Sequence, residues 1–103
     1  MKQSKRNNLE KAGWRAGTVS DFLGLSAEES AYIEMKLALS NKLREEREKK
    51  KLSQVQLARL IASSQSRVAK MEAADPSVSM DLLVKSLLAL GVLPKNVARA
   101  IAA

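Results

Sequence analysis

The segment from Leu52 to Met71, LSQVQLARLIASSQSRVAKM, constrains the fold of this chain more than any other. Apolar residues recur at helical spacing on both sides of a short break. Each half follows a serine, Ser53 or Ser64, whose hydroxyl can accept a hydrogen bond from a free amide of the next turn. The pattern therefore predicts two short helices joined by a tight turn. We expect the second helix to bury Val68 and Met71 and to expose a face of amide, hydroxyl and cationic groups, which suits a polyanion. The residues of this face are Gln65, Ser66, Arg67, Ala69 and Lys70.

Further helices are predicted on both sides of this segment. Helix-forming residues without proline or glycine run from Ser26 to about Lys50, and Ser26 is followed at the capping-box spacing by Glu29. Downstream, an apolar helix from Met80 to Leu90 is capped by Ser79 and ended by glycine, and Pro94 opens a final short helix. We predict an all-α protein of about five helices. Its expected parts are a flexible basic arm (1–12), an N-terminal extension (13–36) and a main helical domain (37–103).

The composition excludes several classes of function. The chain of 103 residues has no cysteine and no histidine, which rules out disulfides, zinc fingers and histidine-based acid–base catalysis. No apolar run approaches the roughly 18 residues of a membrane span. The net charge of +7 indicates an anionic partner. We therefore expect a cytoplasmic protein that needs no cofactor and no metal.

The positive charge is unevenly distributed along the chain. Residues 16–35 contain four acidic residues and no basic one, whereas residues 36–51 contain seven basic and three acidic residues. Within the run from Arg44 to Lys51, charges of opposite sign at i, i+3 and i+4 predict a helix face that pairs with itself. Lys50 and Lys51 lead directly into the first short helix. These two lysines either satisfy the carbonyls of a helix end or attract phosphates, and the sequence leaves both readings open.

The central segment resembles the Xre-like helix-turn-helix family, the lambda-repressor/Cro type, over roughly residues 37–92. The positions that carry the resemblance are Gln54, Leu57, Ala58, Ile61, Val68, Met71 and Glu72. The family prefers glycine where this chain has Lys51, Ala62 and Ala74, each near a helix end or turn. Where such a site needs a positive φ, a residue with a side chain costs about 1 kcal/mol. We therefore expect the residues at these three positions to lower the stability of the protein without changing its fold.

The resemblance implies a lambda-repressor-like five-helix domain with an N-terminal helical extension, acting as a sequence-specific DNA-binding transcriptional regulator. Helix 65–72 would enter the major groove of double-stranded DNA. The side chains expected to read bases are Gln65, Ser66 and Lys70. Those expected to contact phosphates and the backbone are Gln54, Ser53, Ser64, Arg67, Lys50 and Lys51.

Several apolar residues are candidates for a partner interface. The helix Met80–Leu90 is apolar around more of its circumference than one small core requires. The excess is either covered by the final helix of the same chain or buried in a dimer, and we expect a homodimer on a two-fold operator. Trp14 and Phe22 form either a satellite core or a partner-binding patch. The candidate interface residues are Trp14, Phe22, Leu82, Leu88, Val97 and Ile101.

Two other functions compete with DNA binding as explanations of the sequence. Small Xre-like proteins with an extension before the first helix resemble HigA-type antitoxins, so residues 13–35, with their acidic character, are a candidate surface for a ribonuclease toxin. An enzyme is not expected, because capping and DNA contact explain the cluster of Ser63, Ser64 and Ser66 near Lys70 more simply than catalysis does.

Overall fold

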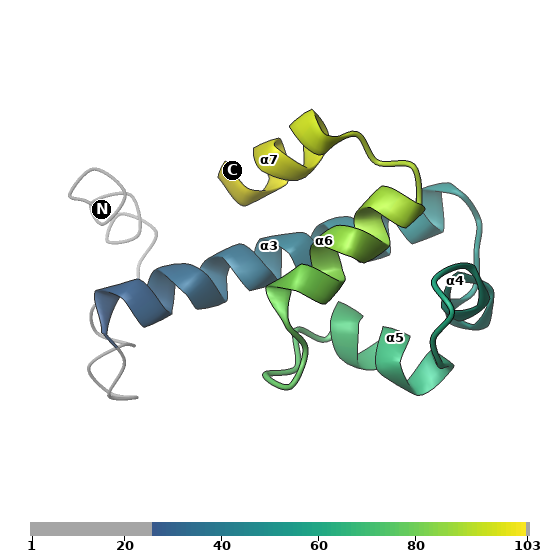
Figure 1. Ribbon diagram of the computed structural model, residues 1–103, viewed down its shortest axis with the longest axis horizontal. Helices are drawn as coiled ribbons and strands as arrows, with labels where there is room; N and C mark the ends of the chain where they lie inside the picture. The colour runs from purple at the N-terminus through teal and green to yellow at the C-terminus, as the bar shows by residue number, and fades with distance from the viewer. Residues whose placement is uncertain (1–25, 103) are drawn as a thin grey trace. The chain divides into compact units, whose positions relative to one another are not determined.

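The computed structural model describes residues 26–102, which form five α-helices (Figure 1). The helices are α3 (Ala27–Lys49), α4 (Gln54–Leu60), α5 (Gln65–Glu72), α6 (Met80–Ala89) and α7 (Pro94–Ala102). No strand occurs within this range, so the predicted all-α class is confirmed. The sequence predictions for Trp14 and Phe22 lie outside the described residues.

The chain divides into two compact units, residues 1–34 and 35–103, and the boundary falls within α3. The helix begins with the predicted capping box. The Ser26 amide donates to Glu29 Oε1 at 2.9 Å, and the Glu29 amide donates to Ser26 Oγ at 3.1 Å. Acidic Glu28 and Glu29 in the first turn, and basic Arg47 and Lys49 in the last, match the polarity of the helix dipole.

In the second unit, α4 and α5 pack against each other and α7 packs against α6 (Figure 1). In the first of these pairs, Leu57, Val68 and Met71 are completely buried, as their spacing predicts. Val68 and Met71 are the buried residues of α5, so the opposite face of this helix remains exposed. The core residues are Leu39, Leu43, Leu57, Ala58, Val68, Met71, Val78, Leu83, Leu87, Leu90, Val92 and Val97.

Helices α3 to α6 all end in the same backbone motif. In each case the amide after a positive-φ residue donates to the carbonyl five positions earlier, which satisfies an otherwise free carbonyl of the last turn. These bonds are Leu52 to Arg47 (3.1 Å), Ser63 to Ala58 (2.7 Å), Asp75 to Lys70 (3.0 Å) and Val92 to Leu87 (3.1 Å). The positive-φ residues are Lys51 (59°), Ala62 (53°), Ala74 (56°) and Gly91 (91°).

Only one of these four ends has the residue type that favours the conformation. Gly91 has no Cβ and adopts positive φ without steric cost. The other three sites carry side chains, and they are the positions where the Xre-like family that the sequence resembles prefers glycine. Their positive φ values confirm that the motif is formed against the preference of the residues that occupy it.

The final helix covers α6 within the same chain. Val97 is 6% exposed and belongs to the core, and Ile101 and Leu82 are partly buried against that core. Of the proposed interface residues in the described range, only Leu88 is strongly exposed, at 43%. Packing inside the monomer therefore accounts for the apolar character of Val97 and Ile101 without a partner.

Candidate nucleic-acid interface

The two short helices are fixed by the predicted serine caps. Ser53 Oγ accepts from the Gln56 amide at 3.0 Å, and the Gln56 side chain accepts from the Ser53 amide at 2.7 Å, which completes a capping box. Ser64 Oγ accepts from the Arg67 amide at 3.2 Å. Both hydroxyls act as acceptors toward the helix, so their protons remain available to a ligand outside it.

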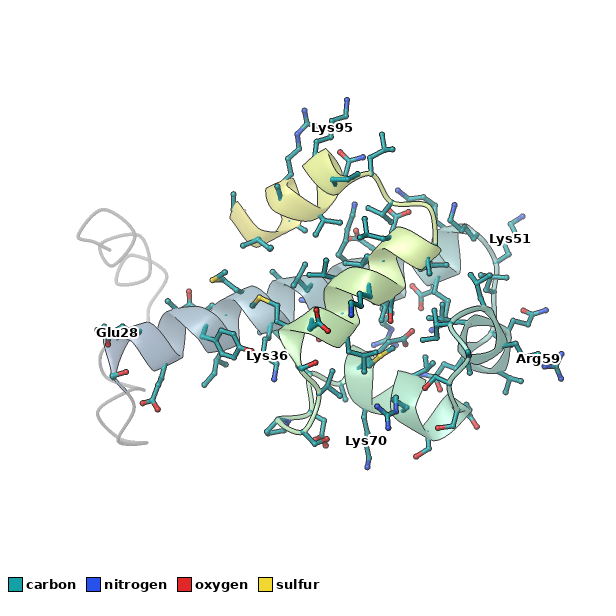
Figure 2. The ribbon with its side chains drawn as sticks, viewed as in Figure 1. Glu28, Lys36, Lys51, Arg59, Lys70 and Lys95 are labelled. Atoms are coloured by element: carbon teal, nitrogen blue, oxygen red, sulfur yellow. The ribbon has the colours of Figure 1, made fainter. Side chains whose placement is uncertain are left out.

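The outer face of α5 is exposed as its sequence predicts. Gln65, Ser66, Arg67 and Lys70 are all exposed, and Ala69 is half-buried. Figure 2 shows the Lys70 side chain pointing outward from α5, away from α6. The helix thus presents polar and cationic groups on its exposed face, while Val68 and Met71 on the opposite face are buried in the core.

A hydrogen-bonded network joins the start of α5 to α4 and to the end of α3. Gln65 Nε2 donates to Gln54 Oε1 at 3.2 Å, and Gln54 Nε2 donates to Glu72 Oε1 at 3.2 Å. The Glu72 carboxylate also accepts from Arg47, through Nε at 2.6 Å and through a terminal nitrogen at 3.1 Å. The other terminal nitrogen of Arg47 donates to the Leu52 carbonyl at 2.7 Å. The network fixes Gln54 with its amide oxygen toward Gln65.

The ion pair at the base of this network is largely removed from water. The side chains of Arg47 and Glu72 are 12% and 5% exposed. The hydrogen bond that Arg47 donates to Glu72 raises the pKa of Arg47 above its ordinary value, against the opposing effect of burial. A desolvated carboxylate that already has two bonds from arginine holds one geometry, and Gln54 takes its orientation from it. Glu72 is one of the positions that carry the family resemblance, but its pairing with Arg47 was not predicted.

The cations of the second unit fall into two groups. Lys42 pairs with Glu46 at 3.1 Å, and the hydrogen bond from Lys42 is the largest of the effects that lower the pKa of Glu46. Arg44 pairs with Glu48 at 3.5 Å, which bears out the predicted self-paired helix face.

Several other cations form no salt bridge within residues 26–102. Five of them lie at the end of α3, on α4 or on α5: Lys50, Lys51, Arg59, Arg67 and Lys70. Arg59, at the end of α4, was not among the residues predicted to contact DNA, because its position in the sequence carries no motif. Arg67 and Lys70 lie on α5 itself, so part of the positive charge that forms no salt bridge lies on the exposed face of this helix.

Comparison with known protein families identifies the arrangement. A sequence model of the helix-turn-helix family HTH_3 matches residues 43–95, just over half of the chain, from the last turns of α3 to the start of α7. Comparisons with curated proteins and with solved structures find no match. No described helix has the length and apolar character to cross a membrane, and no described group of acidic residues has the makings of a metal site. The fold is lambda-repressor-like, and the chain belongs to the helix-turn-helix family HTH_3.

Proposed function

We propose that the protein is a cytoplasmic, sequence-specific transcriptional regulator that reads the major groove of DNA with α5. Membership of a helix-turn-helix family supports DNA binding. The exposed polar face of α5, on which Arg67 and Lys70 form no salt bridge, supports this helix as the element that enters the groove. Phosphate contacts would supply affinity and register, and contacts to base edges would supply specificity.

The observation that carries the proposal is that the side-chain amide of Gln65 is oriented by a hydrogen bond to Gln54. One N–H of this side chain donates to Gln54 Oε1 at 3.2 Å. The other N–H and the oxygen remain, and these are the donor and the acceptor that bidentate pairing with adenine requires. An amide already oriented by its neighbour loses less conformational freedom on binding than a free one. Gln65 is therefore proposed to read adenine, with Ser66 and Lys70 as the other base-reading residues.

The backbone contacts are proposed at the helix ends that surround this face. Lys50 and Lys51 are exposed before α4 and have no acidic partner in the described part of the chain. The hydroxyl protons of Ser53 and Ser64 are available at the starts of α4 and α5. The remaining proposed phosphate contacts are Gln54 and Arg67.

We further propose that the protein acts as a homodimer on a two-fold operator, with half-sites about one DNA turn apart. Leu88 and Leu93 are 43% and 54% exposed at the end of α6 and just after it, which supports a second copy packing there. Sedimentation at tens of micromolar should show a dimer. A purely monomeric protein at that concentration would contradict this part of the proposal.

In vitro selection of bound duplexes from a random pool tests the function directly. The proposal expects an enriched sequence with two-fold symmetry. Gln65→Ala should cost about 1–3 kcal/mol at one base pair of the half-site and relax the preference there. Lys50→Ala, as the contrasting variant, should weaken binding to all sequences alike and reduce the salt dependence. An unchanged base preference in the Gln65 variant would rule out this register of α5.

A second function, as an antitoxin, is favoured by the surface of the first turns of α3. Tyr32 and Ile33 are 46% and 49% exposed there, close in sequence to Glu28 and Glu29. Apolar side chains among carboxylates suit a basic protein partner such as a ribonuclease toxin. If a basic toxin encoded beside this protein binds it, Ile33→Asp should break the complex and leave DNA binding intact. Equal toxin binding by the variant would exclude this surface.

A further inference from the structure

A hollow of about 290 Å³ lies between α5 and the segment that leads to α6. Its lining residues are Ser64, Ser66, Arg67, Lys70, Ser77, Val78 and Leu82. Sites for small organic ligands usually measure about 300–1,000 Å³ and are mostly apolar. This hollow is just below that range and polar at its rim, so it suits a small charged group better than an organic effector.

The charge and hydrogen-bonding capacity of the rim select an anion. Arg67 and Lys70 are the only charged residues that line it, and neither forms a salt bridge within the described range, although Lys70 and Asp75 attract each other at longer range. Ser64 Oγ already accepts the Arg67 amide, so its proton can point outward. Two cations and one hydroxyl donor can bind the oxygens of a tetrahedral anion from several directions.

The opposite wall limits how much negative charge the hollow accepts. The amide and the hydroxyl of Ser77 both donate to Asp75 Oδ1, at 2.8 and 2.7 Å, and these bonds lower the pKa of Asp75. An ionised carboxylate thus lies directly behind Ser77. It repels a phosphate monoester, with about 1.5–2 negative charges, more strongly than a diester, with a single charge. The wall therefore favours a phosphodiester.

We infer that this hollow seats one phosphodiester of the DNA backbone, held jointly by Arg67 and Lys70, so that Lys70 binds the backbone rather than a base edge. The inference rests on the proposed function and revises one residue assignment within it. Gln65 and Ser66 then remain as the residues that read bases. The new participant is the turn Asp75–Ser77, which shapes the far wall.

The test compares Arg67→Ala, Lys70→Ala and the double variant with wild-type protein on the duplex recovered by selection. Lys95→Ala is the matched control, since Lys95 lies on α7, on the opposite side of the second unit from Lys70 (Figure 2). Affinity is measured between 50 and 200 mM salt, and selection is repeated with each variant. All substituted side chains are exposed, so equal melting temperatures should show that folding is intact.

If both cations hold one phosphate in each half-site, the slope of log K against log salt for the dimer becomes shallower by about 1.8 in the double variant, which is about 0.9 for each protomer. Base preference stays unchanged in every variant, and Lys95→Ala alters neither quantity. A change of about 3.6 for the dimer would mean two separate phosphates in each half-site and would overturn the inference. So would a relaxed preference at one base pair in Lys70→Ala.

A direct probe separates the diester from a free anion. Titration of wild-type protein with inorganic phosphate should leave the amide resonances of Ser66 and Lys70 unmoved at low millimolar concentration. Saturable shifts there would identify a free-phosphate site and overturn the inference. Wild-type protein that binds no duplex would refute the proposed function and this inference together, whereas the slope and preference results above refute the inference alone.

Discussion

Glycine at the three strained helix ends should stabilise the protein. Lys51, Ala62 and Ala74 each hold a left-handed backbone conformation with a Cβ present. That conformation costs about 1–2 kcal/mol for a residue with a side chain. Glycine removes the steric cost but adds about 0.5–1 kcal/mol of entropy to the unfolded chain. The expected net gain is about 0.5–1 kcal/mol at each site.

The gains should add in a triple variant. The three sites end different helices and share no hydrogen bond, and substitutions at independent sites combine nearly additively. The summed gain of about 2 kcal/mol corresponds to a rise in melting temperature of about 8–16 °C for a domain of this size. Thermal and urea denaturation followed by circular dichroism at the helical band measure both quantities.

Two reciprocal variants control the experiment. Gly91→Ala should destabilise the protein by about 1 kcal/mol, because the backbone at this position has a φ of 91°. An added Cβ would have no atom within 4 Å to clash with, so the change in stability reports the backbone cost alone. Ala98→Gly, at an exposed site in the middle of α7, should destabilise by about 1 kcal/mol through helix propensity alone. A triple variant that melts at or below the wild-type temperature would refute the assignment of strain to these ends.

Three further predictions concern single side chains. Glu72→Gln should lower the free energy of unfolding, measured by urea denaturation, by about 3–5 kcal/mol, because it leaves Arg47 desolvated without its charge partner. The double change Arg47→Met with Glu72→Leu should recover most of this loss. A mild effect of the single change would mean that the pair is not buried. Ser40→Ala should raise the unfolding free energy by about 1 kcal/mol, because Ser40 is completely buried and its hydroxyl has no partner in the described structure; a loss of stability would point to a hydrogen bond not accounted for. The folded pKa of Asp75 is lowered by its bonds from Ser77, so its contribution to stability is present above the unfolded pKa of about 3.9 and is lost as the pH falls through the folded value. Asp75→Asn should flatten the melting temperature against pH below about pH 4, and an unchanged profile would contradict this.

Much of the fold follows from interactions close in sequence. A serine cap depends on the residue three positions on, and the predicted caps at Ser53, Ser64 and Ser79 are all formed. Inward-facing Val68 and Met71 follow from helical spacing alone. Positive φ at helix ends is equally local. Each of these features could be read from a few neighbouring residues.

The interactions that were not predicted join distant parts of the chain. Arg47 and Glu72 are 25 positions apart, and Gln54 and Gln65 are 11 apart. Their pairing depends on how α3, α4 and α5 pack, which periodicity does not specify. In the same way, the sequence left open whether α7 covers its own chain or a partner, because the amphipathic pattern is identical in both cases. The packing of Val97 in the core decides this for the described structure.

Two neighbouring side chains on α5 differ in their hydrogen bonds, and this difference affects how the DNA sequence preferred by the protein could change during evolution. Gln65 is tied through Gln54 to a desolvated carboxylate, so replacing it also removes a partner from Gln54. Ser66 has no such tie, and its substitution leaves the scaffold intact. In the proposed mode of DNA binding, divergence between related regulators should therefore begin at Ser66, where a mutation would alter the preferred base without the loss of a side-chain hydrogen bond.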